Sequence, residues 1–117
     1  MKQHVKQSVK LTTTGRRSGT PRQVTLYAFE DGDRLIVVGS QGGAAKDPAW
    51  VGNLRAEPRA TVKQGREARA VRAQEVDGTD RDRLWTLVTK GFPLYASYQR
   101  KTDRLIPLFA LETVEGD

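Results

Sequence analysis

The sequence predicts a mainly β fold, a small antiparallel barrel of about six strands with short helices, in one domain over residues 1–117. Short runs of β-branched or alternating apolar residues recur along the chain, with turn residues between them. Helical spacing occurs in only a few short segments. The length of 117 residues suits one domain, because most domains run to roughly 100–150 residues. A β-sandwich is the alternative, but the interrupting helices favour the barrel.

The first three strands should form a meander. Residues 8–14 are β-branched and alternate, and residues 15–21 have the composition of a turn. Residues 22–29 continue as the second strand, and Asp31-Gly32-Asp33 is a hairpin signal, because Asp-Gly readily adopts positive φ angles. Residues 34–40 contain a run of four apolar residues, which predicts a third strand buried on both faces.

The second half of the chain should alternate helices and strands, with two helical segments covering the barrel ends. After a glycine- and alanine-rich loop at 39–46, Asp47 is expected to cap a helix with Pro48 in its first position. Trp50, Val51 and Leu54 form the apolar stripe of that helix. Strands are predicted at 59–64, 67–75 and 105–111. A helix is predicted from Asp77 to Phe92, capped by Asp77, Asp80 and Asp82, and a short helix at 94–101.

Composition excludes several kinds of site. The chain has no cysteine, which rules out disulfides, a thiolate nucleophile and Cys-ligated metals. Its single histidine, His4, lies close to the N-terminus, and a Ser-His-Asp triad or a His-rich metal site would depend on that residue alone. We therefore expect no metal, and an enzyme built on this chain would take its chemistry from a bound organic cofactor.

The charge and hydropathy patterns limit the partners. The net charge is +6, but the basic residues alternate with acidic ones outside the first turn. No RNA-binding aromatic motif is present, so no nucleic-acid partner is expected. No segment has the roughly 20 apolar residues of a spanning helix, and the N-terminus lacks the apolar core of a signal peptide. The expected location is the cytoplasm.

The first turn carries candidate binding chemistry. Arg16, Arg17 and Arg22 surround a Gly-Arg-Arg-Ser-Gly turn. Turn N–H groups and guanidinium forks together suit a phosphate or carboxylates. A solvated basic hairpin tip is the alternative interpretation.

The glycine-rich loop is a second candidate. Residues 39–43 follow a buried strand directly, so the backbone can approach a ligand closely. Lys46 and the start of the next helix would add positive potential there. An ordinary strand-to-helix connection explains the same residues.

The third candidate is the aromatic segment at 92–99, in a chain with only 7% aromatic residues. Tyr95 and Tyr98 would lie on one helix face and line a ring-binding pocket, with hydroxyls as polar groups. Packing in the core is the alternative, since most aromatic pairs at this spacing are simply buried.

Five segments, including those three candidates, follow one another in order over nearly the whole chain, from about Val9 to Leu111. They are Leu11-Thr12-Thr13-Thr14-Gly15-Arg16-Arg17-Ser18-Gly19-x-Pro21-Arg22, Val38-Gly39-Ser40-Gln41-Gly42-Gly43, Lys46-x-Pro48-x-Trp50-x-x-Asn53-Leu54, Phe92-Pro93-x-Tyr95-x-x-Tyr98-Gln99 and Ile106-Pro107. In this order and spacing they resemble the deazaflavin-dependent nitroreductase family of actinobacteria, a family of flavin and deazaflavin oxidoreductases.

The resemblance implies a split β-barrel that binds coenzyme F420, an 8-hydroxy-5-deazaflavin with a phosphate and a polyglutamate tail, with FMN as the less favoured cofactor. The arginines of the turn would hold the anionic tail. The cofactor-binding residues that it implies are Arg16, Arg17, Ser18, Arg22, Gln23, Val24, Thr25, Leu26, Tyr27, Val38, Gly39, Ser40, Gln41, Ala49, Trp50, Val51, Gly52, Asn53 and Tyr95.

The same resemblance implies the reaction. The reduced deazaflavin would transfer a hydride from ring carbon C5 to an electron-poor acceptor such as a quinone, an enone or a nitro compound. Tyr95, Tyr98 and Ser40 would be the catalytic residues, with the tyrosines closing the substrate side and a proton coming from tyrosine or solvent. The protein would position the reactants and exclude water.

The sequence departs from the family pattern in two places. Gln41 stands where relatives commonly carry lysine, and Phe92 stands where they often carry tyrosine. These changes bear on nitroreduction more than on binding of the coenzyme. The N-terminal segment that covers the active site or contacts membrane in many relatives is expected to be short or missing.

Other functions on the same barrel remain open. A non-catalytic binder could hold the deazaflavin or another anionic ligand such as a fatty acid. An FMN-dependent oxidase or a haem-binding protein would use the same fold. For the reductase, the expected partner is a small-molecule electron acceptor. A quinone substrate would bring peripheral contact with the inner membrane, and both monomer and homodimer are open.

Overall fold

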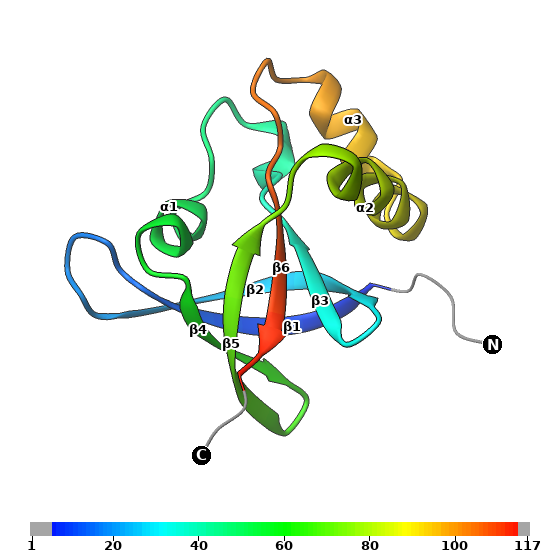
Figure 1. The fold of residues 1–117 in the computed structure, drawn as a ribbon. Coiled ribbons are helices and arrows are strands. Elements are labelled where there is room, and N and C mark those ends of the chain that lie inside the picture. Colours follow the sequence, from blue (N-terminus) through cyan, green and yellow to red (C-terminus); the bar gives the residue numbers. More distant parts are fainter. Residues whose placement is uncertain (1–5, 115–117) are drawn as a thin grey trace.

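In the computed structural model, which describes residues 6–114, six antiparallel strands close into a barrel in the order β1-β2-β3-β6-β5-β4 (Figure 1). Three α-helices and one short 3-10 helix interrupt the strands. The elements are β1 (Gln7–Thr14), β2 (Pro21–Asp31), β3 (Arg34–Val38), η1 (Gln41–Gly43), α1 (Ala49–Ala56), β4 (Arg59–Gln64), β5 (Glu67–Glu75), α2 (Gly78–Gly91), α3 (Leu94–Arg100) and β6 (Leu108–Thr113). The predicted mainly β barrel and its first meander are confirmed.

The last strand is displaced from its predicted position. It begins at Leu108 rather than at residue 105, because Pro107 has no N–H to donate to a strand ladder. Pairing with β3 starts between Leu108 and Val38. Leu105 is 68% exposed and lies in the preceding loop. The predicted third strand is shorter for the same reason, since β3 ends at Val38 where its partner begins.

Two apolar clusters lie on opposite faces of the barrel wall. Alternate residues of β3 show this, because Leu35 and Val37 belong to the cluster inside the barrel while Ile36 and Val38 belong to a second cluster outside it. The outer cluster packs the wall against α2 and α3. The third strand is therefore buried on both faces, as its continuous apolar run predicts.

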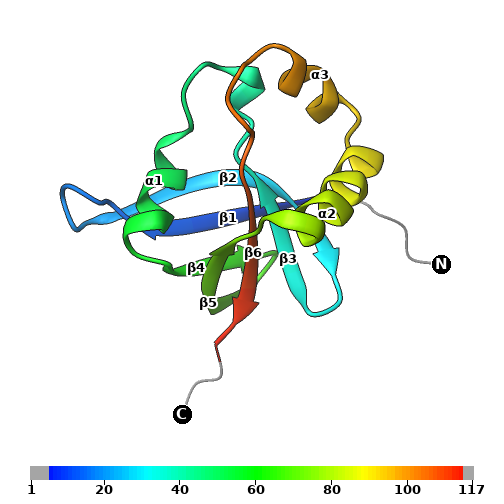
Figure 2. The ribbon, with the colours of Figure 1, turned by 45° about the horizontal axis from the view of Figure 1, so that its top comes forward.

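The helices cover the barrel differently from the prediction. Trp50, Val51 and Leu54 of α1 enter the inner cluster, so α1 closes the barrel interior. Leu84 and Tyr95 of α2 and α3 instead enter the outer cluster. These two helices lie together beside the upper part of β3 and β6 (Figure 2), and they cover an outer face rather than a barrel end.

The predicted aspartate caps are wrong. Pro48 occupies the N-cap position of α1, and no side chain caps the helix. Because the helix begins at Ala49, Asp47 lies one residue before the N-cap, and its carboxylate instead accepts charge-assisted hydrogen bonds from Arg55 and Arg104. Asp77 occupies the N-cap position of α2 but makes no side-chain cap bond. Asp80 accepts from Arg83.

The second strand has one open edge. Residues 21–28 of β2 pair with β1 along their whole length. The pairing of β2 with β3 covers only Ala28 to Asp31. Residues 21–27 therefore lack a strand partner on their other edge within the described part of the chain. This open edge forms a wall of the candidate site.

His4 lies outside the described residues, and the expectation of a single domain over 1–117 stays a prediction. Among residues 6–114, no helix combines the length and the apolar character that crossing a membrane requires.

Candidate functional site

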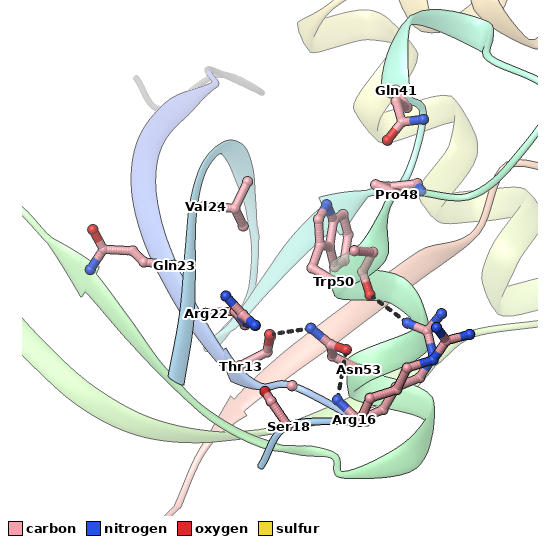
Figure 3. Close-up of a pocket in the computed structure, with 13 residues that line it drawn as sticks. Thr13, Arg16, Ser18, Arg22, Gln23, Val24, Gln41, Pro48, Trp50 and Asn53 are labelled. Carbon is pink, nitrogen blue, oxygen red and sulfur yellow. Dashed lines mark hydrogen bonds between the residues drawn. The ribbon is translucent and has the colours of Figure 1, made fainter. Parts of the chain in front are cut away.

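A long groove runs along the open edge of β2, between that strand and the segment that leads into α1. It consists of two hollows of about 570 Å³ and 700 Å³. Both hollows are lined by the same four residues where they meet, namely Val24, Gln41, Pro48 and Trp50. The two hollows therefore form one continuous site. Figure 3 shows one of them, with Gln41 at the opposite end from Ser18 and Arg16.

One end of the groove is basic. Arg16, Arg17 and Arg22 line it, together with Ser18 and no acidic side chain among the described lining residues. The turn between β1 and β2, which projects beyond the barrel (Figure 1), carries Arg16 and Arg17, and Arg22 follows at the start of β2. Three guanidinium groups without acidic neighbours in the lining suit several negative charges on one ligand.

A buried hydrogen-bond chain anchors this turn to the helix. Asn53 on α1 donates from Nδ2 to Thr13 Oγ1 over 3.1 Å, and its Oδ1 accepts from the Arg16 N–H over 3.1 Å (Figure 3). The Arg16 guanidinium then lies over the first turn of α1, where Nη1 is 3.4 Å from the Ala49 carbonyl. Because Asn53 and Thr13 are buried, the base of the turn is held rigidly although its arginines are exposed.

The other end of the groove is aromatic. Phe92 lies at its centre, with ring centroids 4.8 Å from Tyr95, 5.4 Å from Tyr27 and 6.4 Å from Tyr98, all in edge-to-face geometry. Tyr95 is 5% exposed, and its burial raises the pKa of the phenol well above the ordinary value. Tyr95 therefore stays neutral at working pH and can donate a hydrogen bond. Lys6 Nζ lies 5.3 Å from the Tyr27 ring at this end.

The glycine-rich loop lies where the two ends meet. Gln41 lines both hollows and has a φ of 44°, the one positive φ of a non-glycine residue among the described residues. Such a conformation is uncommon outside glycine and is typical of functional sites. Ser40 is 8% exposed and lines the aromatic end together with Val38.

Most of the residues that the resemblance implied are brought together here. Those lining the groove are Arg16, Arg17, Ser18, Arg22, Gln23, Val24, Thr25, Leu26, Tyr27, Val38, Ser40, Gln41, Ala49, Trp50, Asn53, Tyr95 and Tyr98. Gly39, Val51 and Gly52 are not among the lining residues. Val51 is fully buried in the inner cluster, and a Cβ on Gly39 would lie 2.7 Å from Val51 Cγ2. A Cβ on Gly52 would lie 2.6 Å from Arg16 Nη1, so this glycine makes room for the guanidinium.

Sequence reasoning missed two residues at the groove and one behind it. Ser8 and Thr13 line it from β1. Thr13 follows Val9 and Leu11 in the inward phase of the strand, so the period of two could have identified it as buried. Arg104 contacts the glycine-rich loop from behind, and no local pattern marks it.

The residues of the groove fit coenzyme F420. An extended molecule with a planar ring at one end and several negative charges at the other matches an aromatic end joined to a tri-arginine end. Among the described residues, no strand pairs with the outer edge of β2 between the two ends, so its backbone groups face the groove. Nothing in the lining of the basic end would repel a polyanionic tail.

Comparisons with known proteins give matches over nearly the whole chain. A family model described as F420H(2)-dependent quinone reductase matches residues 2–113. An F420H(2)-dependent quinone reductase of Mycobacterium tuberculosis is 36% identical over 107 residues, which cover 89% of this chain and 72% of that protein. A solved F420-H2 dependent reductase, FDR-A, is 38% identical with a TM-score of 0.83, over 96% of this chain and 99% of that chain.

A second solved structure, described as a domain-swapped dimer, is 40% identical with a TM-score of 0.83, over 90% of this chain and 79% of that chain. These matches confirm the deazaflavin family that the motifs resemble. On the match of the family model over residues 2–113, supported by relatives of 36–40% identity, the chain belongs to the F420H2-dependent quinone reductase family.

Proposed function

We propose that this protein is an F420H2-dependent oxidoreductase that reduces a quinone in the groove along β2. Its family membership supports the deazaflavin cofactor and the quinone acceptor. The observation that carries the assignment of the site is the groove itself, with an acid-free tri-arginine end and an aromatic end on one continuous surface. These two ends match the two chemically different halves of the coenzyme.

At the basic end, Arg16, Arg17 and Arg22 hold the phosphate and the glutamate carboxylates of the tail. Guanidinium forks bind such groups through paired hydrogen bonds. Asn53 holds the backbone of the turn in place before the ligand binds, so binding does not have to order the turn. This end supplies affinity and takes no part in the redox step.

At the aromatic end, Val38, Ser40 and Trp50 line the hollow between the open edge of β2 and the glycine-rich loop, and they would hold the deazaflavin ring. When bound, the reduced coenzyme supplies a hydride, which carries two electrons and one proton to the quinone. A second proton must reach the quinone oxygen to complete the hydroquinone. The hydroxyls of Tyr95 and Tyr98, which line this end, would donate a hydrogen bond to that oxygen, and solvent would supply the proton.

The solved relative described as a domain-swapped dimer supports a homodimer of this chain. Light scattering of the purified protein distinguishes a homodimer from a monomer. Peripheral contact with a membrane through the quinone stays a prediction, to be checked by sedimentation with lipid vesicles.

The first experiment is a fluorescence titration of the protein with coenzyme F420, with FMN in parallel. Micromolar or tighter binding of F420 with weak FMN binding supports the cofactor assignment. A naphthoquinone is then added to the reduced complex, and oxidation of F420H2 is followed by absorbance. Binding without oxidation would indicate a non-catalytic carrier, and absence of F420 binding would contradict the proposed function.

A further inference from the structure

Arg104, in the loop between α3 and β6, holds the glycine-rich loop from behind. Its guanidinium donates to the Ala44 carbonyl from Nε over 2.8 Å, to the Gly39 carbonyl from Nη1 over 3.1 Å and to the Ser40 carbonyl from Nη2 over 2.8 Å. The side chain is only 14% exposed. One side chain thus binds three carbonyls spread over the whole loop. Figures 1 and 2 show the connection from β3 to α1 and the connection from α3 to β6 running side by side above the barrel.

The loop held in this way has an unusual backbone. Gln41, Gly42 and Gly43 all have positive φ angles, of 44°, 63° and 84°. A stretch rich in glycine loses more conformational entropy on ordering than other sequences. A short segment of this kind needs contacts from outside to keep one conformation. Arg104 supplies them on one side, and Gly43 packs against the Tyr98 carbonyl on the other.

The loop is also a wall of the groove. Ser40, Gln41 and Gly42 line its aromatic end, while Arg104 does not line either hollow. The position of this wall decides the width of the ring site. Arg104 therefore acts on the site only through the loop.

The charge of Arg104 is already neutralised inside the protein. Nη1 also donates to Asp47 Oδ1 over 2.7 Å. Asp47 in turn accepts from Arg55, and Arg55 pairs with Glu75 through two bonds of 2.8 Å. A cation with this much local compensation adds little attraction for an anionic ligand. The role left to Arg104 is geometric.

We propose that Arg104 is a positioning residue that pre-forms the ring subsite by holding residues 39–44, and that it determines affinity for the deazaflavin ring without affecting affinity for the tail. This inference rests on the proposed function, because it takes the aromatic end as the ring subsite. Pre-organised loops raise affinity by removing the ordering cost from the binding step.

The test uses two variants, Arg104→Met and Arg104→Lys, and two ligands. One ligand is coenzyme F420, and the other is the deazaflavin riboside that lacks the phosphate and glutamates. Both variants should raise Kd for both ligands by the same factor, about tenfold or more. Lysine keeps the charge next to Asp47 but has no fork to reach three carbonyls, so Arg104→Lys should not restore binding.

Arg55→Met is the matched control. It removes ion pairs to Asp47 and Glu75 from the same network but no bond to a loop carbonyl, so both Kd values should stay unchanged. Unchanged riboside affinity in Arg104→Met, or full recovery in Arg104→Lys, would overturn the inference. If Arg104→Met fails to fold, Arg104→Lys carries the test.

Hydrogen exchange on the ligand-free protein provides an independent readout. The N–H groups of Gly43 and Ala44 close the loop onto the Ser40 and Gln41 carbonyls, and they should exchange faster in the Arg104 variants than in Arg55→Met. Equal exchange in all variants would overturn the positioning role. If the wild-type protein binds no F420, the proposed function fails, and this exchange measurement still decides whether Arg104 holds the loop.

Discussion

The basic end and the aromatic end of the groove are built in opposite ways. Arg16, Arg17 and Arg22 are exposed, and their turn projects from the barrel on a buried anchor. The aromatic end has Tyr95 almost fully buried, with Phe92 packed edge-to-face against three other rings. The first end attracts anions from solvent, and the second presents packed aromatic rings.

One small barrel thus carries an exposed charged end and a packed aromatic end on a single groove. Exposed guanidinium groups contribute affinity that depends on salt and tolerates some movement. A hydride transfer requires reactants held within a narrow range of distance and angle, which only packed side chains provide. Variants at the two ends should therefore have different signatures, and the following experiments test that separation.

The largest effect should come from removing two charges at the basic end. In the double variant Arg16→Ala and Arg22→Ala, two charge-assisted hydrogen bonds of roughly 1.5–3 kcal/mol each are lost. The Kd for coenzyme F420 should therefore rise by about 100-fold or more. Titration with the tail-free riboside is the control and should give the wild-type Kd. An unchanged F420 affinity would remove the basic turn from the cofactor site.

A smaller effect should follow from releasing the anchor of that turn. Asn53→Ala removes the bonds to Thr13 and to the Arg16 N–H, and should lower the free energy of unfolding by about 1–3 kcal/mol. The F420 Kd should rise by about tenfold as the turn loses its position. Thr13→Val is the matched control, because it keeps the bond to Arg16 and should reduce stability with little change in Kd. Equal Kd changes in both variants would contradict the anchoring role.

At the aromatic end, Tyr95→Phe should separate binding from turnover. The F420 Kd should stay within about twofold, and kcat should fall by about tenfold if the hydroxyl serves the acceptor. Burial raises the pKa of the Tyr95 phenol, so Tyr95 stays neutral to a higher pH than an exposed tyrosine does. The wild-type rate should therefore show no loss from this group between about pH 7 and 9. An alkaline fall in that range that disappears in the variant would contradict the assignment.

The smallest effect on the site should come from removing the carboxylate of Asp31, which binds Arg83 of α2. Hydrogen bonds from Arg83 and Arg34 hold the pKa of Asp31 at about 2, below its ordinary 3.8. The unfolded chain takes up the proton first as pH falls, so this stabilisation is lost between about pH 4 and pH 2. Asp31→Asn should lower the free energy of unfolding by about 1–2 kcal/mol at neutral pH, as measured by denaturant titration. The variant should also lose most of the dependence of stability on pH between about pH 4 and pH 2. A changed F420 Kd would show that α2 is coupled to the groove.

Local patterns predicted much of the fold. The strands at Arg59–Gln64 and Glu67–Glu75 have the predicted bounds, because alternation and the Gly65 turn are both encoded within a few residues. The start of β6 could not be read in the same way. It depends on where β3 ends and on Pro107, so pairing across the barrel decided it. The Asp47 cap failed for a similar reason, since one of its two arginine partners, Arg104, comes from the loop before β6.

The candidate site divides along the same line. The arginine turn, the glycine-rich loop and the aromatic helix are sequence features, because composition and short spacing are enough to suggest anion binding, close backbone approach and a ring pocket. That these features share one groove follows from the early end of β3, which leaves residues 21–27 of β2 with an open edge.

The strand-rich pattern, the basic turn and the family could all be read from the sequence, because each depends on residue types at short and ordered spacings. Which side chain holds the glycine-rich loop depends on contacts made by the folded chain. Arg104 and Gly39 are 65 residues apart, and they meet because the loop before β6 must cross the barrel next to the end of β3. Closure of a barrel is a property of the whole chain, and local periodicity carries no information about contacts of that range.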